Sequence, residues 1–246
     1  MKFIKLFEEQ TAFDEAKSTL NRPNVSLIKT NRNVYSLTEE GGGVNANGHS
    51  YVDLGLPSRL KWATMNVGAT SETAYGDYFM WGSTTPNTAS ECTWTNAPFN
   101  NGSSDFNSGY FNDHKSEWLD SKNNLKSEFD AARAIMGGDW RMPTKAEIQE
   151  LIDYTTNEWV EDYKGTGVNG RKFTSKTDTS KYIFIPAAGY CYDGSVTYVG
   201  GRGYVWSSSP STSYPDNAWG LNFSSGGRYM SNNRRYCGQS VRGVCK

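Results

Sequence analysis

The residues that could perform chemistry in this chain are few and widely spaced. Four cysteines occur, Cys92, Cys191, Cys237 and Cys245, without any Cys-x-x-Cys pair. Cys237 and Cys245 are the closest two and could bind copper or act as a redox pair, because thiolates are good Cu(I) ligands. A buried thiol or one structural disulfide explains their spacing better. We therefore expect no catalytic residues among the thiols.

The histidines and carboxylates of the sequence give little indication of a metal site or of acid–base catalysis. The two histidines, His49 and His114, lie far apart in polar stretches, so the spacing of a zinc site and an obvious general base are both missing. Calcium needs about six to eight oxygen ligands, and Asp216 is a lone carboxylate in a sequence that predicts a Pro-Asp turn. We expect no cofactor and no metal site, with a structural Ca²⁺ near Asp105 and Asp113 left open.

The C-terminal third has a different character. Between Tyr182 and Gly227 the only charged residues are Asp193, Arg202 and Asp216, whereas tyrosine, serine, glycine and asparagine are frequent. Stiff aromatic rings among small polar residues are typical of antibody paratopes, and Tyr, Trp and Arg are the usual hot-spot types. An uncharged aromatic surface that does no binding would be unusual.

We therefore predict a ligand-binding surface in this region. Strand alternation assigns Tyr182, Phe184, Trp206 and Phe223 to the core instead. Trp219 lies four residues before Phe223 on the same predicted strand, so both side chains should face the same side. Trp219 could therefore belong to the core instead. The predicted ligand-binding residues are Tyr192, Tyr198, Arg202, Tyr204, Tyr214, Trp219, Asn222, Arg228, Tyr229, Asn232 and Tyr236.

Composition narrows the class of protein. The chain has 246 residues, a net charge of -1, 36% hydrophobic residues and 14% aromatic residues. This balance excludes a basic nucleic-acid-binding surface and a helical bundle, and no apolar run approaches the roughly 20 residues of a membrane helix. Acidic residues follow the N-terminus closely, so we expect synthesis in the cytoplasm without a signal peptide.

The first 43 residues read as a separate segment. Apolar spacing predicts a helix over Glu8 to Leu20. The strands Val25–Ile28 and Asn33–Ser36 predict a hairpin, and Gly41 to Gly43 predict a linker. We expect residues 1–43 to serve attachment or oligomerisation and residues 44–246 to form the ligand-binding domain.

The main domain should be α+β, with two helices between early and late strands. The helices are predicted at Glu128–Met136, ending at Gly137-Gly138, and at Thr144–Tyr154, opening with a Thr144–Glu147 capping box. A long polar loop is expected from Thr84 to Asn124. Strands are predicted at 51–54, 60–64, 77–81, 182–185, 204–207, 217–223 and 240–244.

Many short motifs, in order from Tyr51 to the C-terminus, resemble the Fibrobacter succinogenes major paralogous (FISUMP) domain. They include Tyr51-Val52-Asp53-Leu54-Gly55-Leu56-Pro57, Trp62-Ala63-Thr64, Gly138-Asp139-Trp140-Arg141-Met142-Pro143-Thr144, Trp206-Ser207-Ser208-Ser209 and Ser240-Val241-Arg242. The resemblance implies a C-type-lectin-like fold of the formylglycine-generating-enzyme subtype with two helices and short antiparallel strands. It also implies the kind of protein in which retroelements diversify a C-terminal ligand-binding surface.

On this resemblance we expect the recognition tip of a phage or prophage tail fibre rather than an enzyme. Its partners would be a protein or glycan on a target bacterium and, through the N-terminal segment, other tail or surface structural proteins. Tail fibres are commonly homo-trimers, and neither nucleic acid nor membrane insertion is expected. Localisation would be the virion or the cell surface. The alternatives are a bacterial adhesin or pilus-tip protein and, third, a formylglycine-generating-type oxidase, whose closely spaced catalytic cysteines have no good match here.

Overall fold

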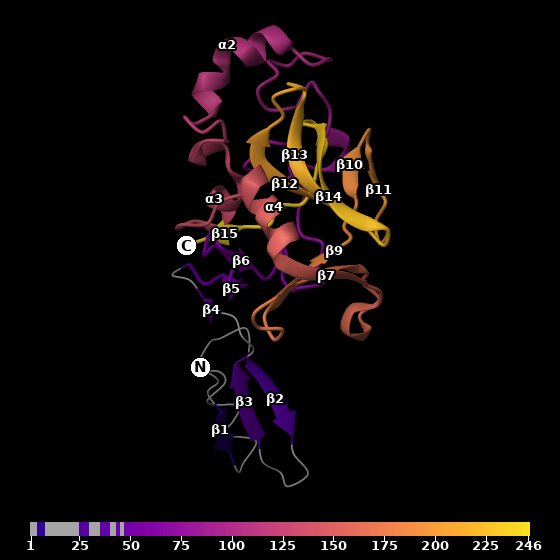
Figure 1. Cartoon of the computed structure of the whole chain (residues 1–246). Coiled ribbons are helices and arrows are strands. Elements are labelled where there is room, and N and C mark those ends of the chain that lie inside the picture. The colour runs from indigo at the N-terminus through magenta and orange to yellow at the C-terminus, as the bar shows by residue number, and fades with distance from the viewer. Residues whose placement is uncertain (1–3, 8–24, 30–34, 40–42, 45–46) are drawn as a thin grey trace.

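The N-terminal strands form a small antiparallel sheet. Its order is β1 (Ile4–Phe7), β3 (Tyr35–Glu39) and β2 (Val25–Lys29), and Ile28 pairs with Ser36. The pairing of the predicted hairpin is therefore present, whereas the predicted helix from Glu8 to Leu20 lies outside the described residues. The computed structural model describes residues 4–7, 25–29, 35–39, 43–44 and 47–246 (Figure 1).

A second sheet joins the two ends of the main region. Gly43, which we expected in a linker, belongs to β4 (Gly43–Val44), and β4 pairs with β5 (Ser50–Asp53). Next in order are β6 (Lys61–Ala63) and β15 (Val244–Cys245). The strands expected at 51–54 and 60–64 are thus present, and a strand from the far end of the sequence pairs beside them.

The segment from residue 235 to residue 245 runs through the interior and contacts distant parts of the chain. Gln239 exchanges two backbone hydrogen bonds with Phe79, and Gly238 exchanges two with Cys191. Because neighbouring residues bond to different segments, no continuous ladder forms. The strands predicted at 77–81 and 240–244 are therefore wrong, apart from single bridges and the short β15.

Arg242 anchors this segment. Its side chain is fully buried, and its guanidinium donates to Asn66 Oδ1, Ala63 O and Phe184 O at 3.0, 3.0 and 2.9 Å. Burial lowers the pKa of this guanidinium. Two of the acceptors lie near Ala63 and the third is on β9, so this one late side chain joins early and middle parts of the sequence.

Both predicted helices are present. α4 (Lys145–Tyr154) begins with the expected capping box, in which Thr144 and Glu147 satisfy each other's backbone N–H groups. The first helix is shorter than predicted, because α3 (Ala131–Met136) starts after the N-cap Asp130, and residues 127–129 form the 3₁₀ turn η2 (Ser127–Phe129). It ends at Gly137, whose φ of 67° lies in the left-handed region.

The polar stretch from 84 to 124 contains a helix that we did not predict. After the short η1 (Ala89–Glu91), α2 (Ser108–Trp118) opens on Asn107, whose side chain accepts from the Tyr110 N–H. Its buried residues are Phe111 and Trp118. Two apolar anchors seven residues apart were too sparse a pattern to indicate a helix.

Two further sheets and a hairpin complete the fold. β7 (Thr155–Val160), β8 (Gly170–Ser175) and β9 (Tyr182–Pro186) form one antiparallel sheet, with the 3₁₀ turn η3 (Tyr163–Gly165) between its first two strands. The other contains β12 (Arg202–Pro210), β13 (Asn217–Ser224) and β14 (Gly227–Arg234), with the hairpin β10 (Tyr190–Tyr192) and β11 (Ser195–Thr197) beside it. We predicted β9, β12 and β13 but missed the other strands of this paragraph.

The sheet β12-β13-β14 separates two apolar cores. Val205, Leu221 and Phe223 face a core that contains Ile148 and Leu151 of α4, and α4 lies across this side of the sheet (Figure 1). Trp206 and Ala218 face the other core, which is rich in aromatic rings and contains Cys92, Cys191 and Cys237. The molecule is α+β with mostly antiparallel strands, as predicted. No helix in the described part of the chain is long and apolar enough to cross a membrane.

Candidate ligand-binding face

One face of the sheet β12-β13-β14, the face to which Trp206 also points, carries three of the predicted residues in one row. Tyr204 of β12 is opposite Asn222 of β13, and Asn222 is opposite Tyr229 of β14. Side chains at paired positions project to the same face. Asn222 therefore points away from Phe223, as the alternation predicted.

The β10–β11 hairpin extends this row with more rings. Tyr190 lies 4.7 Å from Tyr204 and 6.1 Å from Tyr198, measured between ring centroids, and the second pair is stacked. Tyr192 lies 5.8 Å from Tyr236. We call this surface the tyrosine face and define it by Tyr190, Tyr192, Tyr198, Tyr204, Tyr229 and Tyr236.

Two arginines border the tyrosine face. The Arg202 guanidinium lies 4.5 Å from the Tyr198 ring centre and donates a hydrogen bond to the Tyr204 hydroxyl, which raises the pKa of Arg202. A hydrogen bond to the Tyr236 hydroxyl likewise raises the pKa of Arg234. Both cations stay charged at neutral pH, and Arg202 lies against a ring, so the face can offer both aromatic area and charge-assisted hydrogen bonds.

Exposure divides the predicted residues into two groups. Tyr198 and Tyr229 are 51% and 59% exposed, and Tyr192 is 37% exposed. Tyr204, Asn222 and Tyr236 are each 8% exposed, so they contribute little accessible area to the face.

The hairpin holds its rings through tight turns. Asp193 and Gly194 both have positive φ, 49° and 75°, between the paired residues Tyr192 and Ser195, the geometry of a two-residue hairpin loop. Tyr198 also has a positive φ of 62°, which is uncommon for a residue with a large side chain. Such local strain concentrates at functional sites.

Other predicted residues lie elsewhere. Trp219, Arg228 and Asn232 project to the opposite side of the sheet, the side that α4 covers, because their register positions have the parity of Phe223. We expected all the predicted residues to lie on one surface, and for these three residues that expectation is wrong, because they lie on the other side of the sheet. Tyr214 lies in the exposed Pro-Asp turn before β13, closed by a hydrogen bond from Asn217 N to Tyr214 O as that turn predicts.

Sequence reasoning also left out members of the face. Tyr190 was omitted, although it belongs to the tyrosine-rich stretch and centres the ring cluster. Arg234 was omitted as well, because β14 was not predicted. An Asp-Gly pair between short aromatic and β-branched runs is a strong hairpin signal, and Asp193-Gly194 would have placed Tyr190 and Tyr192 on one strand.

The thiols lie in the protein interior, where Cys92 contacts Cys191. All four cysteines are buried and reduced. Burial raises the pKa of Cys237 to about 12 and also raises that of Cys245. No group of three His, Cys, Asp or Glu side chains within the described ranges could hold a metal ion. His49 packs edge-on against Trp140, and His114 bonds to its own helix.

Comparison with known protein families gives a match over most of the chain. No curated protein and no solved structure matches the chain. The family model described as the Lcl C-terminal domain matches residues 58–244, which include the tyrosine face, and this family is associated with the FISUMP and C-type-lectin-like variable-protein group. The match supports a ligand-recognition domain. With a family model covering most of its length, the chain belongs to the Lcl C-terminal domain family.

Proposed function

We propose that this protein binds a ligand on the surface of a target bacterium through the tyrosine face, as the recognition tip of a phage or prophage tail fibre. The observation that carries the proposal is the row of rings across Tyr198, Tyr204 and Tyr229, bordered by Arg202. Tyr204 and Tyr229 are held on strands of one sheet, and rings fixed in this way lose little conformational entropy on binding. A well-ordered surface of this kind is suited to recognising a macromolecule.

The proposal extends to the rest of the protein. The domain would have a C-type-lectin-like fold, would bind without a cofactor and would catalyse no reaction. The N-terminal segment would attach it to other structural proteins of the tail, as a homo-trimer, and the mature protein would be located in the virion. If a retroelement diversifies the gene, the changed codons should fall on the tyrosine face.

Binding to cells tests the proposal directly. The full chain is labelled and mixed with a panel of bacterial strains, and retention is measured by flow cytometry. Tyr198→Ala and Tyr229→Ala should each weaken retention by at least tenfold, since a hot-spot ring contributes about 2 kcal/mol or more. The melting temperature should hardly move, because exposed side chains change stability by only about 0.5 kcal/mol.

Tyr154→Ala is the matched control. Tyr154 ends α4, on the other side of the sheet, and is 54% exposed, close to the 51% and 59% of the two test tyrosines. It should bind like the wild type. Equal loss in all three variants, or normal binding by Tyr198→Ala and Tyr229→Ala on a strain that the wild type binds, would refute this placement of the binding surface.

A further inference from the structure

Three of the four cysteines lie close together in the aromatic core. Cys92, Cys191 and Cys237 are packed in the same group of side chains and are at most 4% exposed. The side chains of Cys92 and Cys191 contact each other directly. One follows the 3₁₀ turn η1 and the other is the middle residue of β10. The contact therefore joins two elements that are far apart in the sequence.

The backbone brings these two cysteines together at Gly238. Cys191 exchanges two backbone hydrogen bonds with Gly238. A Cβ atom at Gly238 would lie 2.7 Å from Cys92 Sγ and 3.0 Å from Cys191 Cβ, so the two side chains converge on space that only glycine leaves free. On the other side, Cys92 Sγ lies 3.3 Å from Thr88 O, and η1 lies beside β11. The pair is thus held from both elements.

The contact makes the two sulfur atoms chemically unequal. A hydrogen bond from the Cys92 thiol lowers the pKa of Cys191, whereas the same contact and burial raise the pKa of Cys92. The thiolate is the nucleophile in disulfide exchange, so Cys191 is the better attacking group. Burial raises the pKa of the neighbouring Cys237 to about 12, which keeps that residue a thiol at neutral pH.

We propose that Cys92 and Cys191 form a disulfide when the protein meets an oxidising environment. The Cys191 thiolate attacks one sulfur of a small organic disulfide and expels its first thiol. Cys92 then loses its proton and attacks Cys191 Sγ, which expels the second thiol. Two protein thiols are oxidised, the small disulfide is reduced to two thiols, and the two protons pass to these. The structure shows the reduced form, the form that a reducing cytoplasm maintains.

The bridge would stabilise the domain and hold the β10–β11 hairpin. The chain between Cys92 and Cys191 is a loop of about 100 residues, and cross-links across long loops constrain the unfolded chain strongly. The oxidised protein should therefore melt roughly 5–15 °C above the reduced protein. Tyr190 and Tyr192 flank Cys191 on β10, so the amides of the hairpin should also exchange their hydrogens more slowly. Neither effect depends on the proposed binding function.

The test uses the full chain and oxidised glutathione. The protein is unfolded in urea and refolded with oxidised glutathione in excess over the reduced form, so that burial does not keep the oxidant from the thiols. The remaining thiols are alkylated in urea and counted by intact mass, and peptide mapping without reduction identifies the linked cysteines. The expected result is two free thiols in place of four, with Cys92 linked to Cys191. Dithiothreitol should reverse the rise in melting temperature.

Alanine variants assign the effect to this pair. Cys92→Ala and Cys191→Ala should show no difference between oxidised and reduced melting temperatures. Cys245→Ala is the matched control, because Cys245 is equally buried but pairs with Lys61 on β6 instead, and it should keep the full difference.

Three results would overturn the proposal. They are four free thiols in the refolded wild type, a link from Cys191 to Cys237, and an oxidised wild type that melts no higher than the reduced protein. If one alanine variant does not fold, the thiol count and the peptide map of the wild type still decide, because they need no substitution.

Discussion

Replacing Arg242 by methionine should destabilise the domain more than any surface change. Its guanidinium satisfies Asn66 Oδ1, Ala63 O and Phe184 O in a fully buried position. Hydrogen bonds to a charged group contribute about 1.5–3 kcal/mol each, so the three together contribute roughly 5–9 kcal/mol. Removing the buried cation recovers several kcal/mol of its desolvation penalty. The expected net loss is about 3–5 kcal/mol in the free energy of unfolding.

Urea unfolding at pH 7 measures this loss as a lower midpoint at an unchanged slope. For a chain of 246 residues, the melting temperature should fall by roughly 6–20 °C. The free energy of unfolding of Arg242→Lys should lie between those of the wild type and Arg242→Met. Lysine keeps the charge, but its ammonium cannot reach three acceptors in the fixed directions of a guanidinium. Arg228→Met, at an exposed position on β14, is the control and should change stability by only about 0.5 kcal/mol. An Arg242→Met protein as stable as the control would refute the reasoning.

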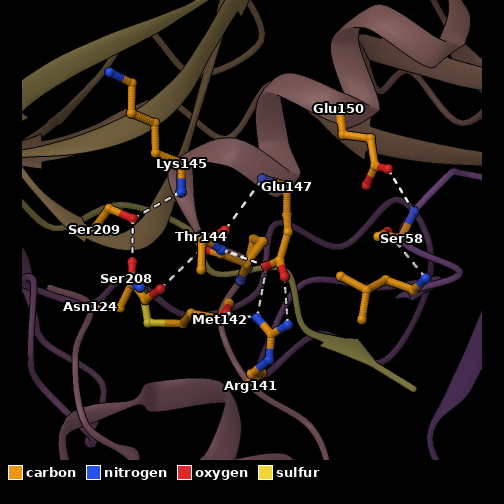
Figure 2. A network of polar contacts seen from close by, with 12 residues as sticks. Ser58, Asn124, Arg141, Met142, Thr144, Lys145, Glu147, Glu150, Ser208 and Ser209 are labelled. Atoms are coloured by element: carbon orange, nitrogen blue, oxygen red, sulfur yellow. Dashed lines mark hydrogen bonds and ion pairs between the residues drawn. The ribbon is translucent and has the colours of Figure 1, made fainter. Parts of the chain in front are cut away.

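Two further predictions concern pH and metal. Burial opposes the charge of Glu147, but hydrogen bonds from Arg141 and Thr144 outweigh it and lower its pKa below 4.5 (Figure 2). Its stabilising effect should therefore be complete above pH 4.5 and fade as the pH falls through the lowered pKa. In urea titrations, the stability that Glu147→Gln loses at pH 7 should shrink steadily as the pH is lowered below 4.5, and a loss that stays constant with pH would contradict this. Chelation should leave the melting temperature within about 5 °C of the untreated value, and a larger fall in calorimetry would reveal a metal site that contributes to folding.

The parts of the fold that could be predicted are those that depend on residues close together in the sequence. The capping box at Thr144 and Glu147 and the glycine stop at Gly137 involve residues within one helical turn, so their signals do not depend on the rest of the fold. β13 was predicted because its apolar residues alternate with polar ones. By contrast, α2 sits in a polar stretch and is held by a few buried rings, which leave little pattern in the sequence.

The tyrosine face was predictable in composition and only partly in geometry. Tyrosine, arginine and asparagine in a charge-poor stretch indicated a binding surface, yet composition does not say which side of a sheet a residue faces. Parity within β13 separated Asn222 from Trp219 correctly, but the absence of a prediction for β14 left Arg228 and Asn232 without a register. Tyr190 joins the face only because the hairpin folds back against β12, which is tertiary information.

The path of residues 235–245 has a consequence for how quickly the protein can fold. This segment bonds to Phe79, to Cys191 and, through Val244, to Trp62, so its contacts span most of the length of the sequence. Closing such long loops costs conformational entropy before the contacts form that stabilise the fold. Proteins dominated by distant pairings therefore fold in milliseconds to seconds rather than microseconds. The early strands should therefore reach their final packing late, and the half-formed sheet edges that wait for this segment are where aggregation would compete with folding.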